Sequence, residues 1–171
     1  VSFLHEEESM DWNGRWCKET RSRLWNFNLH YFEFLHPLTK QYLETGSACY
    51  LGKTVQMIQG WIRQNPKEQA GDGWSSYAIS LRLTNWLAYL SAIGSHLHAN
   101  FRKELTAAIY EQYVWLSTHL EQGILGNHYF ENLKTLVLCA VFFHDTVALS
   151  TVLPAFYAGC REEILSDGMH F

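Results

Sequence analysis

One short stretch of the chain, from Gly126 to Asn132, combines residue types that can bind a carboxylate. It reads Gly-Asn-His-Tyr-Phe-Glu-Asn, and helix-compatible residues follow to about His144. Gly126 and Asn127 are typical of a helix start. At about 100° per residue, one side of this helix would carry His128, Glu131, Asn132, Thr135 and Cys139. A helix N-terminus presents free N–H groups and a partial positive charge, so the stretch predicts a site for an acidic ligand.

The same stretch also has a purely structural interpretation. Asn127 can be an ordinary helix cap, His128 and Glu131 can lie on a solvated face, and Asn132 can satisfy a neighbouring loop. A metal site is the weaker alternative, because His128 and Glu131 supply two ligands and the spacing places no third. We therefore predict no metal and no cofactor.

A second candidate surface lies on the helix expected over residues 75–95. One side of it carries leucine and isoleucine, and the other carries Arg82, Asn85, Trp86 and Tyr89. A guanidinium fork pairs well with acid groups, and flat rings offer surfaces to sugar faces. The alternative is that Arg82 pairs with a carboxylate at a helix end and the rings fill the core. The functional interpretation predicts that this stripe and the stripe of helix 127–144 face a common groove.

Composition excludes several classes of protein. A chain of 171 residues with 47% hydrophobic and 15% aromatic residues can build one domain with a real core. The net charge of −4 gives no basic field, so nucleic acid is not an expected partner. The sequence has no apolar run near the roughly 20 residues of a membrane span, so no membrane is expected. The spacing of the cysteines favours free thiols at Cys17, Cys49, Cys139 and Cys160.

The order of turn and helix signals predicts an all-α fold. Residues 1–25 are expected to be an irregular lead-in that lies on the domain through Trp12, Trp16 and Trp25. Periodic segments then alternate with short breaks, which favours antiparallel helical hairpins in either a solenoid or an α/α toroid. The expected helices start near Asn26, break at Pro37, and resume over 38–45, 51–64, 75–95, 100–121, 127–144 and 150–165, with Asn100 as a cap and Pro154 in a first turn.

Three motifs resemble a known family. Asn28 to Phe32, Ser80 to Trp86 and Leu125 to Asn132 resemble, in this order, the N-terminal domain of heparinase II/III-like polysaccharide lyases. The resemblance covers residues from about Trp25 to Phe171. It implies that residues 26–171 form part of an incomplete α/α toroid, followed in the family by a β-sandwich domain that this chain lacks. It also implies cleavage of a uronic-acid polysaccharide, such as a glycosaminoglycan or alginate, by β-elimination.

The resemblance also assigns roles to the residues of the first motif described. It implies that Asn127 or His128 binds and neutralises the uronate carboxylate, with Glu131 orienting that residue. In the family a downstream tyrosine and a histidine of the β-sandwich complete the site, and the tyrosine follows a segment resembling 167–171. Tyr157 is not at that position, so the chain alone is expected to be inactive. A bacterial, periplasmic or secreted parent protein is expected, with a cytoplasmic one left open.

Two other classes of function remain open at this point. One is a noncatalytic carbohydrate-binding or polysaccharide-assembly protein of the same fold, which the absence of the downstream tyrosine would favour. The other is a helical interaction domain in which all three motifs pack. That alternative predicts that His128, Glu131, Arg82 and Asn85 do not converge on one concave surface.

Overall fold

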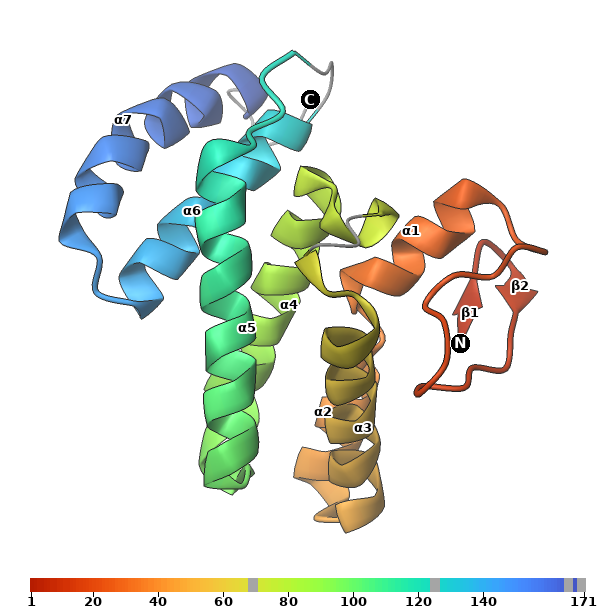
Figure 1. Cartoon of the computed structure of the whole chain (residues 1–171). Helices are drawn as coiled ribbons and strands as arrows, with labels where there is room; N and C mark the ends of the chain where they lie inside the picture. The colour runs from red at the N-terminus through yellow and green to blue at the C-terminus, as the bar shows by residue number, and fades with distance from the viewer. Residues whose placement is uncertain (68–70, 124–126, 165–167, 169–171) are drawn as a thin grey trace.

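Helices make up nearly all of the regular structure in the described residues, which are 1–67, 71–123, 127–164 and 168 of this computed structural model. A two-stranded antiparallel sheet pairs β1 (Ser2–Phe3) with β2 (Glu6–Glu7) near the N-terminus. The prediction of an all-α fold is therefore confirmed (Figure 1). The helices are α1 (Arg23–Tyr31), α2 (Leu35–Thr45), α3 (Ala48–Gln64), α4 (Ser76–Ile93), α5 (Ala99–Thr118), α6 (His128–Phe142) and α7 (Thr146–Glu163), with 3-10 turns η2 (Asp72–Trp74) and η3 (Gly94–His96).

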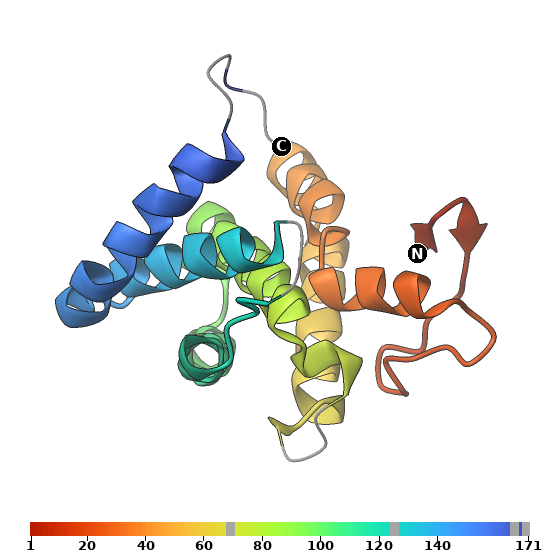
Figure 2. The ribbon, with the colours of Figure 1, turned by 90° about the horizontal axis from the view of Figure 1, so that it is seen from above.

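Helix α4 occupies the centre of the array. It contacts α1, α2, α5 and α6, while α2 packs on α3 and α6 packs on α7. Seen from above, α6 lies on one side of α4 and the α2–α3 pair on the other (Figure 2). Most side chains of α4 are consequently buried, and they include polar ones such as Ser80, Arg82 and Asn85.

An aromatic core fixes the first part of the chain to α4. Trp25, Trp61 and Trp86 are at most 2% exposed, and the ring of Trp86 meets Phe32 edge-on at 5.2 Å. Trp12 and Trp16 are also buried, which confirms that indoles hold the lead-in against the domain. The lead-in is shorter than predicted, because α1 begins at Arg23 with Ser22 as its cap.

The break after α1 falls at a residue that the sequence did not indicate. Phe32 adopts the left-handed conformation with φ of 66°, and α2 then starts at Leu35. Pro37 was expected to break the helix but lies within its first turn, where backbone N–H groups have no helical partner to lose. Gly46 ends α2 with φ of 66°, as predicted.

Two later helix starts also differ from expectation. His98, not Asn100, occupies the cap of α5, and its ring accepts a hydrogen bond from the Asn100 backbone N–H. Helix α7 begins at Thr146, where Asp145 Oδ1 accepts from the Ala148 N–H at 2.9 Å, so Pro154 lies inside the helix. The expected features at Gly126, Leu165 and 167–171, apart from Gly168, lie outside the described residues.

Candidate functional site

The first turn of α6 gathers two partly exposed polar side chains, Asn127 and His128. Asn127 holds the cap position, and its carbonyl oxygen accepts from the Glu131 N–H at 2.9 Å. Its side chain makes no capping hydrogen bond, and it lies near enough to the Tyr77 hydroxyl to lower the pKa of that phenol. The prediction of a helix start at Asn127 is correct, but its amide is not used by the helix.

His128 is held on two sides by residues from other segments. Its ring stacks on Tyr77 with centroids 4.1 Å apart and planes 19° apart. Its Nδ1 lies 3.3 Å from Oε2 of Glu121, which follows α5. The His128 side chain remains 35% exposed. The ring is therefore fixed in position while part of it faces solvent.

Glu131 does not orient His128, contrary to the role expected for it. Its Oε2 lies 2.5 Å from Nζ of Lys134, one turn along the same helix. The carboxylate that contacts His128 belongs to Glu121 instead. Helical periodicity could not identify Glu121, because the residue lies outside α6, shortly after the end of α5.

Asn132 was expected to contact substrate but is fully buried. Its Oδ1 accepts from the Glu121 backbone N–H at 3.0 Å, and its Nδ2 donates to Ser80 Oγ at 3.0 Å. The expectation of substrate contact is therefore wrong, and the alternative that Asn132 satisfies a neighbouring loop is correct. Through these bonds Asn132 ties the backbone of Glu121 to α4.

Burial keeps the two tyrosines of this cluster protonated. It raises the pKa of Tyr31 to about 12, with smaller contributions from Tyr77, Glu33 and Glu121. Burial also raises the pKa of Tyr77; Glu131, Glu33 and Glu121 add to this, and the side chain of Asn127 opposes it. The edge of one ring meets the face of the other, with centroids 5.9 Å apart. At neutral pH both phenols can donate hydrogen bonds, and neither is suited to act as a base.

Arg82 lies in the core, so the expectation that it faces a groove is wrong. Its Nε donates to Gln112 Oε1 at 2.7 Å, Nη1 to the His30 carbonyl at 3.1 Å and Nη2 to the Gly73 carbonyl at 2.8 Å. The guanidinium carbon also lies 3.8 Å from the centroid of a Trp61 ring. Each of these partners belongs to the fold, so the fork has no face left for a ligand.

The other members of the same stripe are also structural. Asn85 donates to the Tyr31 carbonyl at 2.8 Å and accepts from His36 Nε2 at 2.8 Å. Trp86 is fully buried, and the Tyr89 hydroxyl is hydrogen-bonded to Thr54 at 2.8 Å. The expectation failed because α4 is the central helix, so its polar side chains meet the backbone and side chains of its neighbours.

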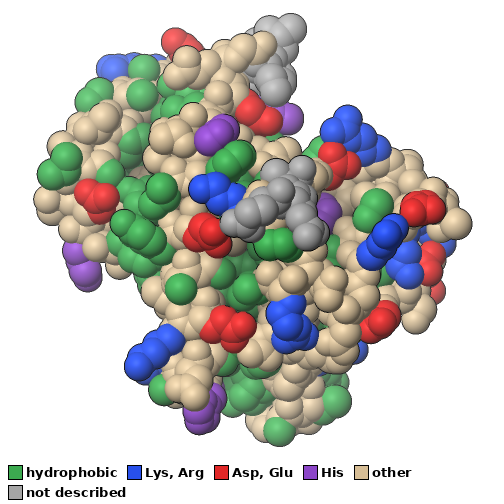
Figure 3. Space-filling model, viewed as in Figure 1, with side chains coloured by type: hydrophobic (Ala, Val, Ile, Leu, Met, Phe, Trp, Pro, Cys, Tyr) green, Lys and Arg blue, Asp and Glu red, His purple; other side chains and the backbone are tan. Residues whose placement is uncertain are grey.

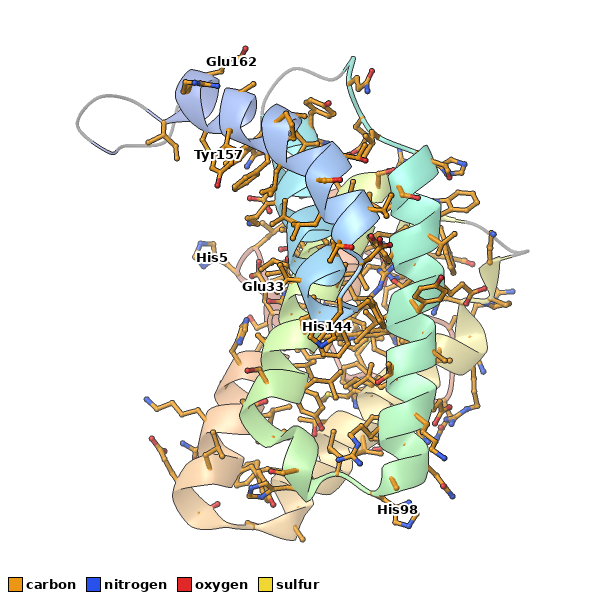
Figure 4. The ribbon with its side chains drawn as sticks, turned by 90° about the vertical axis from the view of Figure 1, so that its left-hand side faces the viewer. His5, Glu33, His98, His144, Tyr157 and Glu162 are labelled. Atoms are coloured by element: carbon orange, nitrogen blue, oxygen red, sulfur yellow. The ribbon has the colours of Figure 1, made fainter. Side chains whose placement is uncertain are left out.

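The two predicted stripes thus do not share a groove. Thr135 on α6 donates to the Ser80 carbonyl at 3.0 Å, so the α6 stripe packs against α4. Arg82 and Asn85 behave as the packing hypothesis predicts, whereas Asn127 and His128 remain accessible at the top of that interface. Tyr157 projects from α7 and is 58% exposed (Figure 4). Among the described residues, no cluster of three or more His, Cys, Asp or Glu side chains has the arrangement of a metal site.

Comparison with protein families identifies the class of this fold and site. The family model described as "Heparinase II/III N-terminus" matches residues 2–171, and the chain belongs to that family. The structure also resembles the crystal structure of heparan sulfate lyase HepC from Pedobacter heparinus, with a TM-score of 0.76 and 20% identity. That match covers 95% of this chain and 26% of HepC, so the chain spans about a quarter of the length of this relative. No curated protein sequence matches the chain.

Two further expectations can be compared with the described residues. All four cysteines are free thiols, as predicted. Across residues 1–67, 71–123 and 127–164, no helix combines the length and apolar character needed to cross a membrane.

Proposed function

We propose that this chain is the N-terminal, substrate-cleft part of a polysaccharide lyase that cleaves a uronic-acid polysaccharide by β-elimination. The observation that carries the proposal is the first turn of α6, where Asn127 and His128 are partly exposed and held from behind by Tyr77 and Glu121. These side chains sit beside the free N–H groups of a helix N-terminus, which favour an anion. The family membership supports the same assignment.

The chemistry of β-elimination needs what this turn can supply. A base removes the C5 proton next to the uronate carboxylate, the electron pair forms the C4–C5 double bond, and the C4–O bond breaks. Negative charge develops on the carboxylate as an enolate, so preorganised donors aimed at its oxygens stabilise the transition state. Asn127 can donate from its amide, and the imidazolium form of His128 can donate from Nε2 while its Nδ1–H is directed at Glu121.

The base and the acid for the leaving oxygen must come from elsewhere. The raised pKa of Tyr31 and Tyr77 disfavours the phenolate of both residues at neutral pH, so we assign neither of them the role of the base. We propose that the parent protein supplies these groups from a downstream tyrosine and from a histidine of a β-sandwich domain, as the resemblance to its family implies. The chain alone is then a binding half-site without turnover.

The charge distribution supports a local site for the anionic polymer. The net charge is −4, and on the face that carries α5 acidic and basic side chains are interspersed (Figure 3). No long-range attraction therefore draws a polyanion to the protein, and its acid group must be held by the α6 turn. A substrate of this kind is met outside the cytoplasm, so we propose a periplasmic or secreted parent protein.

A second candidate is a noncatalytic carbohydrate-binding or polysaccharide-assembly protein of the same fold. The observation in its favour is that burial raises the pKa of Tyr77, which stacks on His128, and of Tyr31, which contacts Tyr77, so neither is suited to act as a base. Such a protein would use the same turn to bind uronate without cleaving the chain.

The test is to incubate the full-length protein with heparan sulfate, chondroitin sulfate and alginate and follow the ultraviolet absorbance of unsaturated uronate. We expect one of these polymers to be cleaved, and Asn127→Ala to lower turnover by about 10²–10³, as for loss of one transition-state donor. Asn100→Ala is the matched control, because Asn100 is exposed on α5. Binding without product would favour the noncatalytic function, and wild-type turnover by Asn127→Ala would overturn the carboxylate-binding role.

A further inference from the structure

Tyr77 contacts both side chains proposed to bind the uronate. Its ring stacks on that of His128 with centroids 4.1 Å apart, and its hydroxyl lies near enough to the Asn127 amide for that amide to lower its pKa. Tyr77 belongs to the first turn of α4, the most buried helix of the fold. A single partly buried side chain therefore connects the central helix to both residues of the α6 turn.

Glu121 contacts the same imidazole at its edge. Its carboxylate lies 3.3 Å from Nδ1 of His128, and its side chain is only 18% exposed. The backbone N–H of Glu121 is bonded to Asn132, and Asn132 is bonded in turn to Ser80 of α4. Glu121 is thus fixed to α4 as well, although it lies outside every helix.

These two contacts constrain different properties of His128. Stacking on Tyr77 fixes the plane of the ring, because the two rings are in face-to-face contact. A carboxylate at Nδ1 fixes the position of one proton, because an ionised carboxylate can only accept a hydrogen bond. With Nδ1–H directed at Glu121, Nε2 becomes the nitrogen that meets the ligand.

We propose that Tyr77 and Glu121 are positioning residues for the carboxylate-binding turn. Tyr77 sets the plane of the His128 ring and the direction of the Asn127 amide. Glu121 accepts from Nδ1–H and balances the charge of the imidazolium, whose Nε2–H donates to the uronate. This role rests on the proposed function of Asn127 and His128. Glu131, which shares a helix with His128, has no part in it because its carboxylate pairs with Lys134.

Three substitutions separate the components of this arrangement. Tyr77→Phe keeps the ring and removes the hydroxyl, Tyr77→Leu removes both, and Glu121→Gln keeps the size and removes the charge. In the full-length protein we expect kcat to fall about 10–100-fold for Tyr77→Leu and Glu121→Gln with little change in KM, as for loss of a charge-assisted bond. Tyr77→Phe should lie between these variants and wild type.

Nuclear magnetic resonance of the His128 ring gives a readout that does not depend on turnover. With histidine labelled and His128 assigned by its loss in His128→Gln, Tyr77→Leu should move the ring protons downfield, because the tyrosine ring current is lost. Tyr77→Phe should leave them in place. Glu121→Gln should shift the ¹⁵N signal of Nδ1, whereas the control Glu131→Gln should not. Tyr110→Leu, at a residue 53% exposed on α5, is the control for loss of a tyrosine.

The two readouts separate failure of this inference from failure of the proposed function. If the full-length protein cleaves no uronate polymer, the function is wrong, and the ring signals alone decide whether Tyr77 and Glu121 hold His128. If Asn127→Ala abolishes turnover but Tyr77→Leu and Glu121→Gln turn over like wild type, the positioning role is wrong. Unchanged His128 signals in both variants would also overturn it.

Discussion

Helix α4 supports two polar clusters, one closed around Arg82 and one half-open around His128. Each cluster contains a guanidinium or an imidazole together with amides and aromatic rings. The sequence predicted a ligand site at each of them. They differ in how their polar atoms are used. The three donor nitrogens of Arg82 end on groups of the fold, whereas the Asn127 amide and one edge of His128 remain accessible. The residue types alone therefore predict a ligand site at both clusters. The hydrogen-bond partners of each polar atom show which cluster is a structural network and which has groups accessible to a ligand.

The closed cluster joins four parts of the chain. Arg82 on α4 bonds to the end of α1 at His30, to η2 at Gly73 and to α5 at Gln112. The guanidinium is fully buried and rests on Trp61, so the ring face and the carbonyl oxygens take the place of a carboxylate. Burial lowers the pKa of Arg82 well below its usual range. Such a network gives stability and geometry, and it has no free group for chemistry.

The largest expected effect comes from removing the buried guanidinium. Arg82→Leu leaves Gln112 and two carbonyl oxygens without their donor, and each unsatisfied buried group costs about 1–3 kcal/mol, so we expect a loss of about 3 kcal/mol or more of unfolding free energy. Arg82→Lys keeps the charge but not the fork, and it should lie between Arg82→Leu and wild type. Urea unfolding measures both.

The matched control for this prediction is Arg15→Leu, because the Arg15 side chain is 86% exposed. It should change stability by no more than about 0.5 kcal/mol. If Arg82→Leu were as stable as wild type, the closed cluster would have no structural role, and the distinction between the two clusters would fail.

The second prediction compares two buried amides. Asn85→Ala and Asn132→Ala each remove a doubly bonded side chain, so each should lower stability by about 1–3 kcal/mol. Only Asn132 supports Glu121, so only Asn132→Ala should also lower turnover of folded full-length protein. If the two variants turned over substrate at the same rate, the bonds of Asn132 would not support the cluster around His128.

The third prediction concerns acid. Burial lowers the pKa of His30 from 6.5 to about 3, and its Nδ1 accepts from Trp61 Nε1 at 3.0 Å. Above pH 6.5 neither the folded nor the unfolded state binds a proton here, so the full stability is present. As the pH falls toward 3, only the unfolded state takes up the proton, and stability declines by up to about 1.4 kcal/mol per unit.

Chemical unfolding of wild type and His30→Gln between pH 7 and pH 4 measures this contribution. The variant is less stable at pH 7 because it loses the bond from Trp61, but its stability should fall less steeply with acid. Identical slopes in the two proteins would mean that His30 takes up a proton in the folded state.

The smallest effect is a difference in cysteine reactivity along α6. Cys139 lies on the same side of α6 as His128, but it is fully buried. Burial raises the pKa of its thiol to about 12. Cys17 and Cys49 are exposed. Because the thiolate is the reactive form, iodoacetamide at neutral pH should modify the two exposed cysteines while leaving Cys139 unmodified. Rapid modification of Cys139 in the folded protein would show that its thiol is accessible to the reagent.

The features predicted from the sequence are those set by local pattern. Trp12 and Trp16 were expected to pack, and Gly46 was expected to end a helix, because indole burial and left-handed glycine need only local information. The break at Phe32 was missed, because a left-handed phenylalanine has no sequence signal. Its conformation is stabilised by the surrounding rings, including a stack on Trp16 at 5.1 Å.

The candidate site was only partly predicted, because only some of its features are set by the local sequence. The start of α6 at Asn127 follows from the Gly-Asn signal, whereas the roles of Arg82 and Asn132 depend on which backbone groups face them. Periodicity gives the side of a helix but not what lies opposite. Tyr77 and Glu121 were missed because they reach His128 from a different helix and from a connection.

The most direct test of the difference between the clusters is a paired measurement of turnover and thermal melting on Asn127→Ala and Arg82→Lys in the full-length protein. We expect Asn127→Ala to lose about 10²–10³ in the rate of unsaturated uronate formation with its melting temperature nearly unchanged, because its amide is not used by the helix. Arg82→Lys should melt earlier but turn over at near the wild-type rate at a temperature where it is folded. Wild-type turnover in Asn127→Ala, or abolished turnover in fully folded Arg82→Lys, would contradict the assignment of chemistry to the α6 turn and structure to the core of α4.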